Sequence, residues 1–217
     1  MKKPLPVQID VALWKPVVSA AEILVLGTEA REQQFRAVCV HGAHVALAYS
    51  QLGDSGVKVV ALVGFPLGAA DADVKRYETE VAIDADAHEI EVVPNLGLLK
   101  DGQLKQCLRE LRDVVEAADE RPVCVALEAA LLTRDEILHA VDLIVDSGAQ
   151  AVSTGTDFWP DVRVSADDVK LLREAVGPKF IVKATGGVRD AQTALALLEA
   201  GASRISLAHP VALVMTS

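Results

Sequence analysis

The sequence predicts an α/β protein, a closed (β/α)8 barrel that takes up residues 1–217 as a single domain. Short apolar runs rich in β-branched residues alternate with longer segments of helical pattern, which is typical of parallel strands joined by right-handed crossovers. The alternation gives eight strands, and no GxGxxG motif follows the first strand, so a barrel is favoured over an open dinucleotide-binding sheet. The chain is 51% hydrophobic but only 4% aromatic, so alanine, valine and leucine must fill the core.

The expected strands are short and apolar, and the helical segments between them are longer. The strands lie at residues 7–13, 37–41, 58–64, 89–95, 122–128, 150–156, 180–186 and 204–209. The helical segments lie at residues 42–52, 73–84, 104–118, 133–145, 165–175 and 190–200. Thr133 and Glu136 have the spacing of a capping box, Ser165 opens the next helix, and Gly201 closes the last one.

The charge of the chain argues against a nucleic-acid partner. The formal net charge is −10 at pH 7, and no run of lysine or arginine is typical of a phosphate-backbone contact. An anionic substrate would therefore need local backbone N–H groups or a few placed cations.

The cysteines and the hydropathy pattern predict a cytoplasmic protein without a metal or a cofactor. Cys39, Cys107 and Cys124 have neither CxxC nor zinc-ligand spacing, and no HxH or HExxH motif occurs. The first residues lead into no apolar run of the length of a signal peptide, so none is expected. No stretch reaches the roughly 18 apolar residues of a membrane span.

Polar residues stand where the expected strands run out into the following loops, which is the end of a (β/α)8 barrel that carries active sites. These residues are Asp10, His41, Asn95, Glu128, Ser153, Thr154, Lys183 and His209, and Glu91 lies within the fourth strand. Glu91, Glu128 and Asp10 could act as general acids or bases if burial raises their pKa, or could form interior salt bridges. A histidine at a strand end is more often held by a local hydrogen bond than catalytic, so we assign no role to His41 or His209.

Lys183 is the most informative of these residues. It lies between Val182 and Ala184 in an apolar strand, where burial penalises a charged ammonium group. One interpretation is a functional amine of lowered pKa, or a cation that holds another group. The other is a structural ion pair with a carboxylate such as Glu91 or Glu128. The pattern favours neither interpretation over the other.

The turn that follows this strand, Gly186-Gly187-Val188-Arg189, is a candidate anion cradle. Two glycines at a strand end expose backbone N–H groups, and the next helix adds the positive end of its dipole. The alternative is an ordinary turn between a strand and a helix.

Five stretches together carry a family resemblance. Residues 64–68 read GFPLG, residues 89–97 read EIEVVPNLG, and residues 182–189 read VKATGGVR. Residues 9–16 read IDVALWKP, and residues 201–205 read GASRI. By these motifs, which occur in the expected order over nearly the whole chain, the sequence resembles the deoxyribose-phosphate aldolase family. The resemblance implies a (β/α)8 barrel and aldolase chemistry through a Schiff base.

The chain departs from the family pattern at the residue that forms the Schiff base. The family has a lysine on the sixth strand, in a pattern like FIKTSTGF, where this chain reads QAVSTGT. The lysine position falls on Ser153 without a gap, or on Ala151 when the STG residues are aligned, and no lysine lies between Lys105 and Lys170. The fourth-strand aspartate of the family is Glu91 here. The last-strand phosphate loop, GTSSG in the family, reads SLAHP, so weak phosphate binding is expected.

The resemblance implies a carbon–carbon lyase acting on a small aldehyde or keto substrate. Lys183 would be the Schiff-base nucleophile or an electrostatic stabiliser, Glu91 the proton shuttle, and Asp10 a third catalytic residue. The expected substrate- and phosphate-binding residues are Gly186, Gly187, Arg189, Ser153 and Thr154. The alternative is an inactive family member that keeps the barrel as a binding or assembly module. A homodimer is the assembly to be tested.

Overall fold

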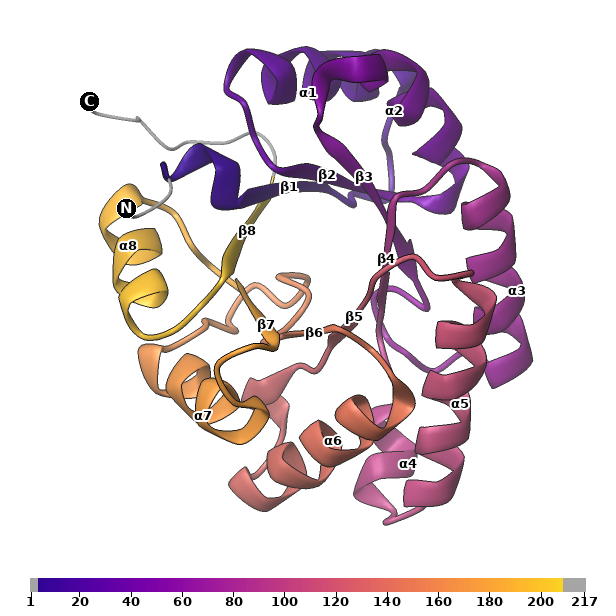
Figure 1. Cartoon of the computed structure of the whole chain (residues 1–217), viewed down its shortest axis with the longest axis vertical. Helices are drawn as coiled ribbons and strands as arrows, with labels where there is room; N and C mark the ends of the chain where they lie inside the picture. Colours follow the sequence, from indigo (N-terminus) through magenta and orange to yellow (C-terminus); the bar gives the residue numbers. More distant parts are fainter. Residues whose placement is uncertain (1–3, 209–217) are drawn as a thin grey trace.

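The computed structural model of the chain describes residues 4–208, in which eight parallel strands close into a barrel in sequence order. The strands are β1 (Ile9–Leu13), β2 (Ala37–His41), β3 (Lys58–Val63), β4 (Glu89–Val92), β5 (Val123–Ala126), β6 (Ala151–Ser153), β7 (Ile181–Thr185) and β8 (Arg204–Ala208). β8 pairs with β1 and so closes the ring, which leaves no free sheet edge. Figure 1 shows this ring with the helices around its outside. The predicted (β/α)8 barrel is confirmed.

The helices alternate with the strands, as the pattern predicts. They are α1 (Ala20–Glu32), α2 (Val45–Leu52), α3 (Ala72–Asp84), α4 (Leu96–Lys100), α5 (Leu104–Ala117), α6 (Arg134–Ser147), α7 (Ala166–Val176) and α8 (Ala191–Glu199). Short 3-10 helices occur at Pro6–Gln8, Gly42–His44, Gly53–Ser55 and Ala129–Leu131. The capping box of α6 is present, with Thr133 accepting from the Glu136 N–H and Glu136 accepting from the Thr133 N–H. Among residues 4–208, no helix is long and apolar enough to cross a membrane.

Two helices, α1 and α4, are absent from the segments expected from the sequence. α1 begins after Ser19, which forms a capping box with Glu22, so the S-x-x-E signal at its start could have revealed it. α4 has only five residues and begins after Asn95, whose side chain accepts a hydrogen bond from the Leu98 N–H. This early start of α4 also ends the preceding strand sooner than expected, at Val92.

The apolar residues form two separate clusters. The larger cluster lies between the strands and the helices, and includes Val182 and Ala184 of β7. The smaller cluster fills one side of the barrel interior; its members are Ala12, Ala37, Cys39, Val60 and Leu62, and Trp14 and Phe65 pack against it. Because side chains alternate along a strand, Lys183 lies between two outward residues and points into the barrel. The interior is therefore apolar on the side of β1–β3 and polar around β7.

Candidate active site

Lys183 is buried inside the barrel and is held by two carboxylates. Its Nζ lies 2.6 Å from Oε2 of Glu91 on β4 and 3.1 Å from Oδ2 of Asp10 on β1. The Lys183 side chain is only 2% exposed. The expected ion pair with a carboxylate is confirmed, with Glu91 rather than Glu128 as the partner, and Asp10 is a second partner that the sequence did not indicate.

A layer of ion pairs supports this site from the amino-terminal end of the barrel. Arg36 donates from Nε to Oδ1 of Asp10 at 2.5 Å and from a terminal nitrogen to Oδ2 at 2.8 Å. Arg36 also donates to Glu89 at 2.6 Å, and Arg204 donates to the other oxygen of Glu89 at 2.7 Å. Asp10 thus links this layer to Lys183. Three cations and three carboxylates are connected, so the network as a whole is neutral.

The charges of the network fix the protonation of Lys183. Burial by itself would lower the pKa of Lys183, but the negative charges around the amine raise the pKa well above its ordinary value. The Cys39 thiol lies 3.7 Å from the amine, and burial raises the pKa of that thiol, so Cys39 is neutral at pH 7. The carboxylates of Glu91 and Asp10 therefore supply the negative charge. The resting amine is protonated, which differs from the lowered pKa considered from the sequence.

Asp10 is held ionised by the same network. Burial by itself would raise its pKa, but the positive charges of Lys183 and Arg36 outweigh that effect, and the pKa lies below its ordinary value. Asp10 is therefore a fixed anion rather than a general acid or base.

The two hydroxyl residues at the end of β6 have different surroundings. Ser153 pairs in register with Lys183, and its Oγ lies 2.7 Å from Oγ1 of Thr185 and donates to the Gly155 carbonyl at 3.0 Å. Thr154 instead donates to the Thr185 carbonyl and accepts from the Thr185 N–H, both at 2.8 Å. Ser153 therefore lies in the interior beside Lys183, whereas the Thr154 hydroxyl joins the end of β6 to the end of β7.

Glu128 lies after β5 and does not reach Lys183 as an ion-pair partner. Its backbone is in the left-handed region, with φ 49°, and Oε1 accepts from the Thr156 N–H at 3.0 Å and from the Thr156 hydroxyl. Burial raises the pKa of Glu128, although the hydrogen bonds from Thr156 oppose that effect. The side chain anchors the loop that follows β6.

The glycine turn after β7 is covered by the loop between β6 and α7. The Gly187 N–H donates to Oδ1 of Asp157 at 2.6 Å, and the Val164 N–H donates to the Gly186 carbonyl at 3.1 Å. A Cβ on Gly187 would meet the side chain of Arg163, and the backbone of Gly187 has a φ of 66°, in the region that favours glycine. Asp157 was not among the expected site residues, because nothing in the local pattern ties it to a turn thirty residues later. Arg189 is exposed.

Aromatic rings gather over the carboxyl end of the barrel. Trp14 lies 5.9 Å from Phe65 and 5.7 Å from Phe158, and Phe65 lies 6.1 Å from Phe158, measured between ring centroids. His41 packs against Phe65, and its Nε2 lies 3.2 Å from the Trp14 carbonyl. This agrees with the local hydrogen bond expected for a strand-end histidine, whereas His209 lies outside the described residues. Within residues 4–208, the buried indole N–H groups of Trp14 and Trp159 have no hydrogen-bond partner.

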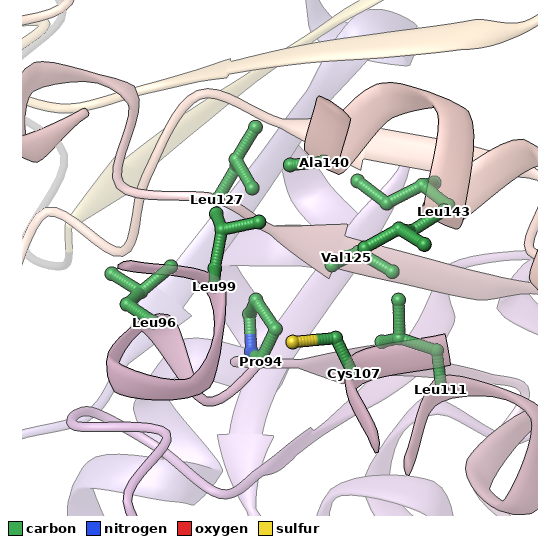
Figure 2. A pocket seen from close by; sticks show the side chains of 10 residues that line it. Pro94, Leu96, Leu99, Cys107, Leu111, Val125, Leu127, Ala140 and Leu143 are labelled. Carbon is green, nitrogen blue, oxygen red and sulfur yellow. The ribbon is translucent and has the colours of Figure 1, made fainter. Parts of the chain in front are cut away.

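Neither a metal-ligand cluster nor the cavity among α4–α6 offers a competing site within the described residues. Within the described part of the chain, no group of three His, Cys, Asp or Glu side chains could hold a metal ion. Figure 2 shows a cavity of about 20 Å³ that lies outside the barrel wall, among the strands and α4–α6. Its lining consists of Pro94, Leu96, Leu99, Cys107, Leu111, Val125, Leu127, Ala140, Leu143 and Ile144. A cavity with this apolar lining is a gap in the packing rather than a substrate site.

A closed (β/α)8 barrel that buries a lysine beside carboxylates has the groups that imine-forming enzymes use. No family model matches the chain. Deoxyribose-phosphate aldolase of Exiguobacterium sibiricum is 45% identical over 207 residues, which cover 95% of this chain and 93% of that protein. The enzyme of Halalkalibacterium halodurans is 42% identical over 216 residues, which cover 99% and 96%. The chain belongs to the deoxyribose-phosphate aldolase family.

Solved structures agree with this assignment. The structure titled "QR15, an Aldolase" superposes with a TM-score of 0.89 and 34% identity, over 93% of this chain and 90% of that chain. The tetrameric deoxyribose phosphate aldolase of Aeropyrum pernix gives a TM-score of 0.87 and 29% identity, over 94% and 86%. The family resemblance seen in the sequence is therefore confirmed.

Proposed function

We propose that the protein makes and breaks carbon–carbon bonds in small β-hydroxy aldehydes or ketones through an imine on Lys183. The observation that carries this proposal is the position of Lys183, buried inside the barrel with Glu91 at 2.6 Å. An imine nucleophile needs an amine that can lose its proton to a nearby acceptor, and Glu91 is placed to be that acceptor. Membership in an aldolase family supports the same reaction class.

The other lysines of the described residues are poorly placed for this chemistry. Lys75 is buried, but it lies in the helix layer and pairs with Glu110 at 2.9 Å. The remaining lysines of residues 4–208 are exposed; they are Lys15, Lys58, Lys100, Lys105, Lys170 and Lys179. These amines lie on the molecular surface, whereas imine chemistry needs an enclosed site that excludes water. Strand β6, on which the family pattern has its lysine, carries Ala151, Val152 and Ser153.

In the proposed reaction, Glu91 first takes a proton from the Lys183 ammonium. The neutral amine attacks the carbonyl carbon to form a carbinolamine, and Glu91 returns its proton to the carbinolamine oxygen as water leaves. The resulting iminium accepts the electrons of the breaking carbon–carbon bond while Glu91 takes the proton of the β-hydroxyl, which releases an aldehyde and leaves an enamine. Glu91 then gives that proton to the enamine carbon, and addition of water to the iminium so formed releases the second carbonyl product and restores the Lys183 ammonium. Asp10 stays anionic and stabilises the cationic intermediate.

The test is reductive trapping with borohydride and a panel of aldehydes and ketones, followed by peptide mass mapping. We expect a reduced adduct on the peptide that contains Lys183, and its loss in Lys183→Arg, which keeps the charge. A trapped adduct that persists at full yield in Lys183→Arg would exclude this lysine. Absence of an adduct in the wild type, with every substrate tried, would favour the inactive binding module instead.

A second experiment asks whether a lysine on β6 improves the site. In Ser153→Lys, the new amine would lie beside Lys183, whose positive charge would lower the pKa of the introduced amine. We expect faster aldol cleavage and a trapped adduct on residue 153. Ser153→Met is the matched control, since it adds similar volume without an amine, and equal rates in both variants would contradict the interpretation.

The assembly and the location are proposed on separate grounds. Exposed apolar side chains lie on neighbouring helices α1, α2 and α3; they include Leu24, Val25, Tyr49, Val74, Tyr77 and Val81. This face is our candidate for a homodimer contact, to be tested by light scattering of the purified protein. The three cysteines are buried and unpaired, and they support a reducing compartment such as the cytoplasm.

A further inference from the structure

The carboxylate of Asp157 is hydrogen-bonded to a backbone N–H group, that of Gly187, at the carboxyl end of the barrel. Its carboxylate accepts the Gly187 N–H at 2.6 Å, which is a short, charge-assisted hydrogen bond. Asp157 has a φ of 60°, in the left-handed region where non-glycine residues are uncommon. Since the backbone takes this conformation, the loop directs the carboxylate at the glycine turn instead of leaving it in solvent.

The loop that carries Asp157 is joined to the end of β7 at several points. Thr154 bonds both the N–H and the carbonyl of Thr185, and the Val164 N–H bonds the Gly186 carbonyl. The stem of Arg163 lies over Gly187. An anion that approached the glycine turn would thus meet a side chain above it and a carboxylate already at its N–H.

The next residue in this loop makes the region in front of the glycine turn more apolar. Phe158 follows Asp157 and packs with Trp14 and Phe65 above the apolar cluster of the interior. Rings of this kind favour an apolar or neutral group and penalise the desolvation of a charged one.

From these contacts we infer that the site selects carbonyl substrates without a phosphate group, and that Asp157 is the residue that determines this specificity. The inference rests on the proposed aldolase function and adds the class of substrate. The carboxylate takes the N–H that a phosphate oxygen would need, and its negative charge repels a dianion. A neutral hydroxyl at the far end of the substrate could instead donate to the free lone pairs of Asp157.

The first experiment is calorimetric titration with inorganic phosphate, which does not depend on turnover. We expect no saturable binding to the wild type at low millimolar phosphate. Asp157→Gly suits the left-handed backbone and frees the Gly187 N–H, so phosphate should bind at least about tenfold more tightly. Asp157→Asn removes the charge but keeps an acceptor near the N–H, so its gain should be smaller.

Asp161→Asn is the matched control, because Asp161 is an exposed carboxylate of the same loop. It changes the net charge by the same amount, and phosphate binding should stay as weak as in the wild type. An equal gain in Asp161→Asn, no gain in Asp157→Gly, or tight phosphate binding by the wild type would each overturn the inference.

The second experiment compares kcat/KM for 2-deoxyribose and deoxyribose 5-phosphate. We expect the wild type to prefer the unphosphorylated sugar, and the ratio to shift by about tenfold or more toward the phosphate in Asp157→Gly. If no variant turns over either sugar, the proposed function fails, while the phosphate titration still decides the role of Asp157. A wild type that prefers the phosphorylated sugar would contradict the inference alone.

Discussion

Lys183 is held by two carboxylates that have different partners of their own. Asp10 also receives two hydrogen bonds from Arg36, and its pKa is lowered, so it stays ionised. Glu91 has its short contact with Lys183, at 2.6 Å. Asp10 is therefore the counter-charge in the proposed reaction, and Glu91 is the proposed proton acceptor for the ammonium.

The first prediction concerns the pair of Lys183 and Glu91. Lys183→Met should lower the free energy of unfolding by about 3–5 kcal/mol, because it leaves the buried Glu91 carboxylate without its partner. Glu91→Gln should cost less, because Lys183 keeps Asp10 at 3.1 Å. The double variant should cost less than the sum, since it removes both charges. Urea denaturation of all four proteins measures the difference.

The control for this cycle is the exposed pair of Lys170 and Asp167, whose charged atoms lie 3.2 Å apart on α7. Lys170→Met and Asp167→Asn should together change the free energy of unfolding by less than about 1 kcal/mol. Additive costs for Lys183 and Glu91 would show that the two charges do not stabilise each other.

At the scale of elements, the segment between β6 and α7 differs most from what the sequence predicts. Residues 150–156 were expected to form a strand, but β6 ends at Ser153. The following residues bond instead to neighbouring loops: Thr154 to the end of β7, and Thr156 to Glu128. These partners are distant in sequence, so a local pattern of apolar and β-branched residues cannot reveal them.

The second prediction tests the packing of this segment at Gly155. A Cβ at this position would lie 2.8 Å from Oε2 of Glu128, which is itself fixed by Thr156. Gly155→Ala should therefore displace the Glu128 side chain and lower the free energy of unfolding by about 1–3 kcal/mol. Thermal or urea denaturation provides the measurement.

Gly42→Ala is the matched control for Gly155→Ala, because a Cβ on Gly42 would meet no atom within 4 Å. This variant should be neutral or more stable by up to about 1 kcal/mol, since alanine restricts the unfolded chain. Equal losses in both variants would mean that the contact with Glu128 has no role.

At the scale of the whole molecule, the barrel was predicted from eight strands that alternate with helices and from the lack of a GxGxxG motif after the first strand. The strand order follows from that alternation, because each crossover places the next parallel strand beside the last. The position of Lys183 could also be predicted from the sequence, since a lysine between Val182 and Ala184 has to face the interior. The pairing of Lys183 with Asp10 and the contact from Asp157 to Gly187 could not be predicted, because both depend on how distant strands are staggered around the ring.

The neutral network inside the barrel makes stability depend on pH, and Lys183 provides the clearest case. Its pKa in the folded protein is raised well above the ordinary 10.5, so its contribution is complete below that value and decreases as pH rises beyond it. The destabilisation caused by Lys183→Met should thus be constant up to about pH 10 and then shrink by up to about 1.4 kcal/mol per pH unit. Urea denaturation of both proteins over the range from about pH 8 to about pH 12 covers this window. Lys179→Met, at an exposed position, should show no such change. A loss that stays constant throughout the alkaline range would mean that the carboxylates do not hold the Lys183 proton.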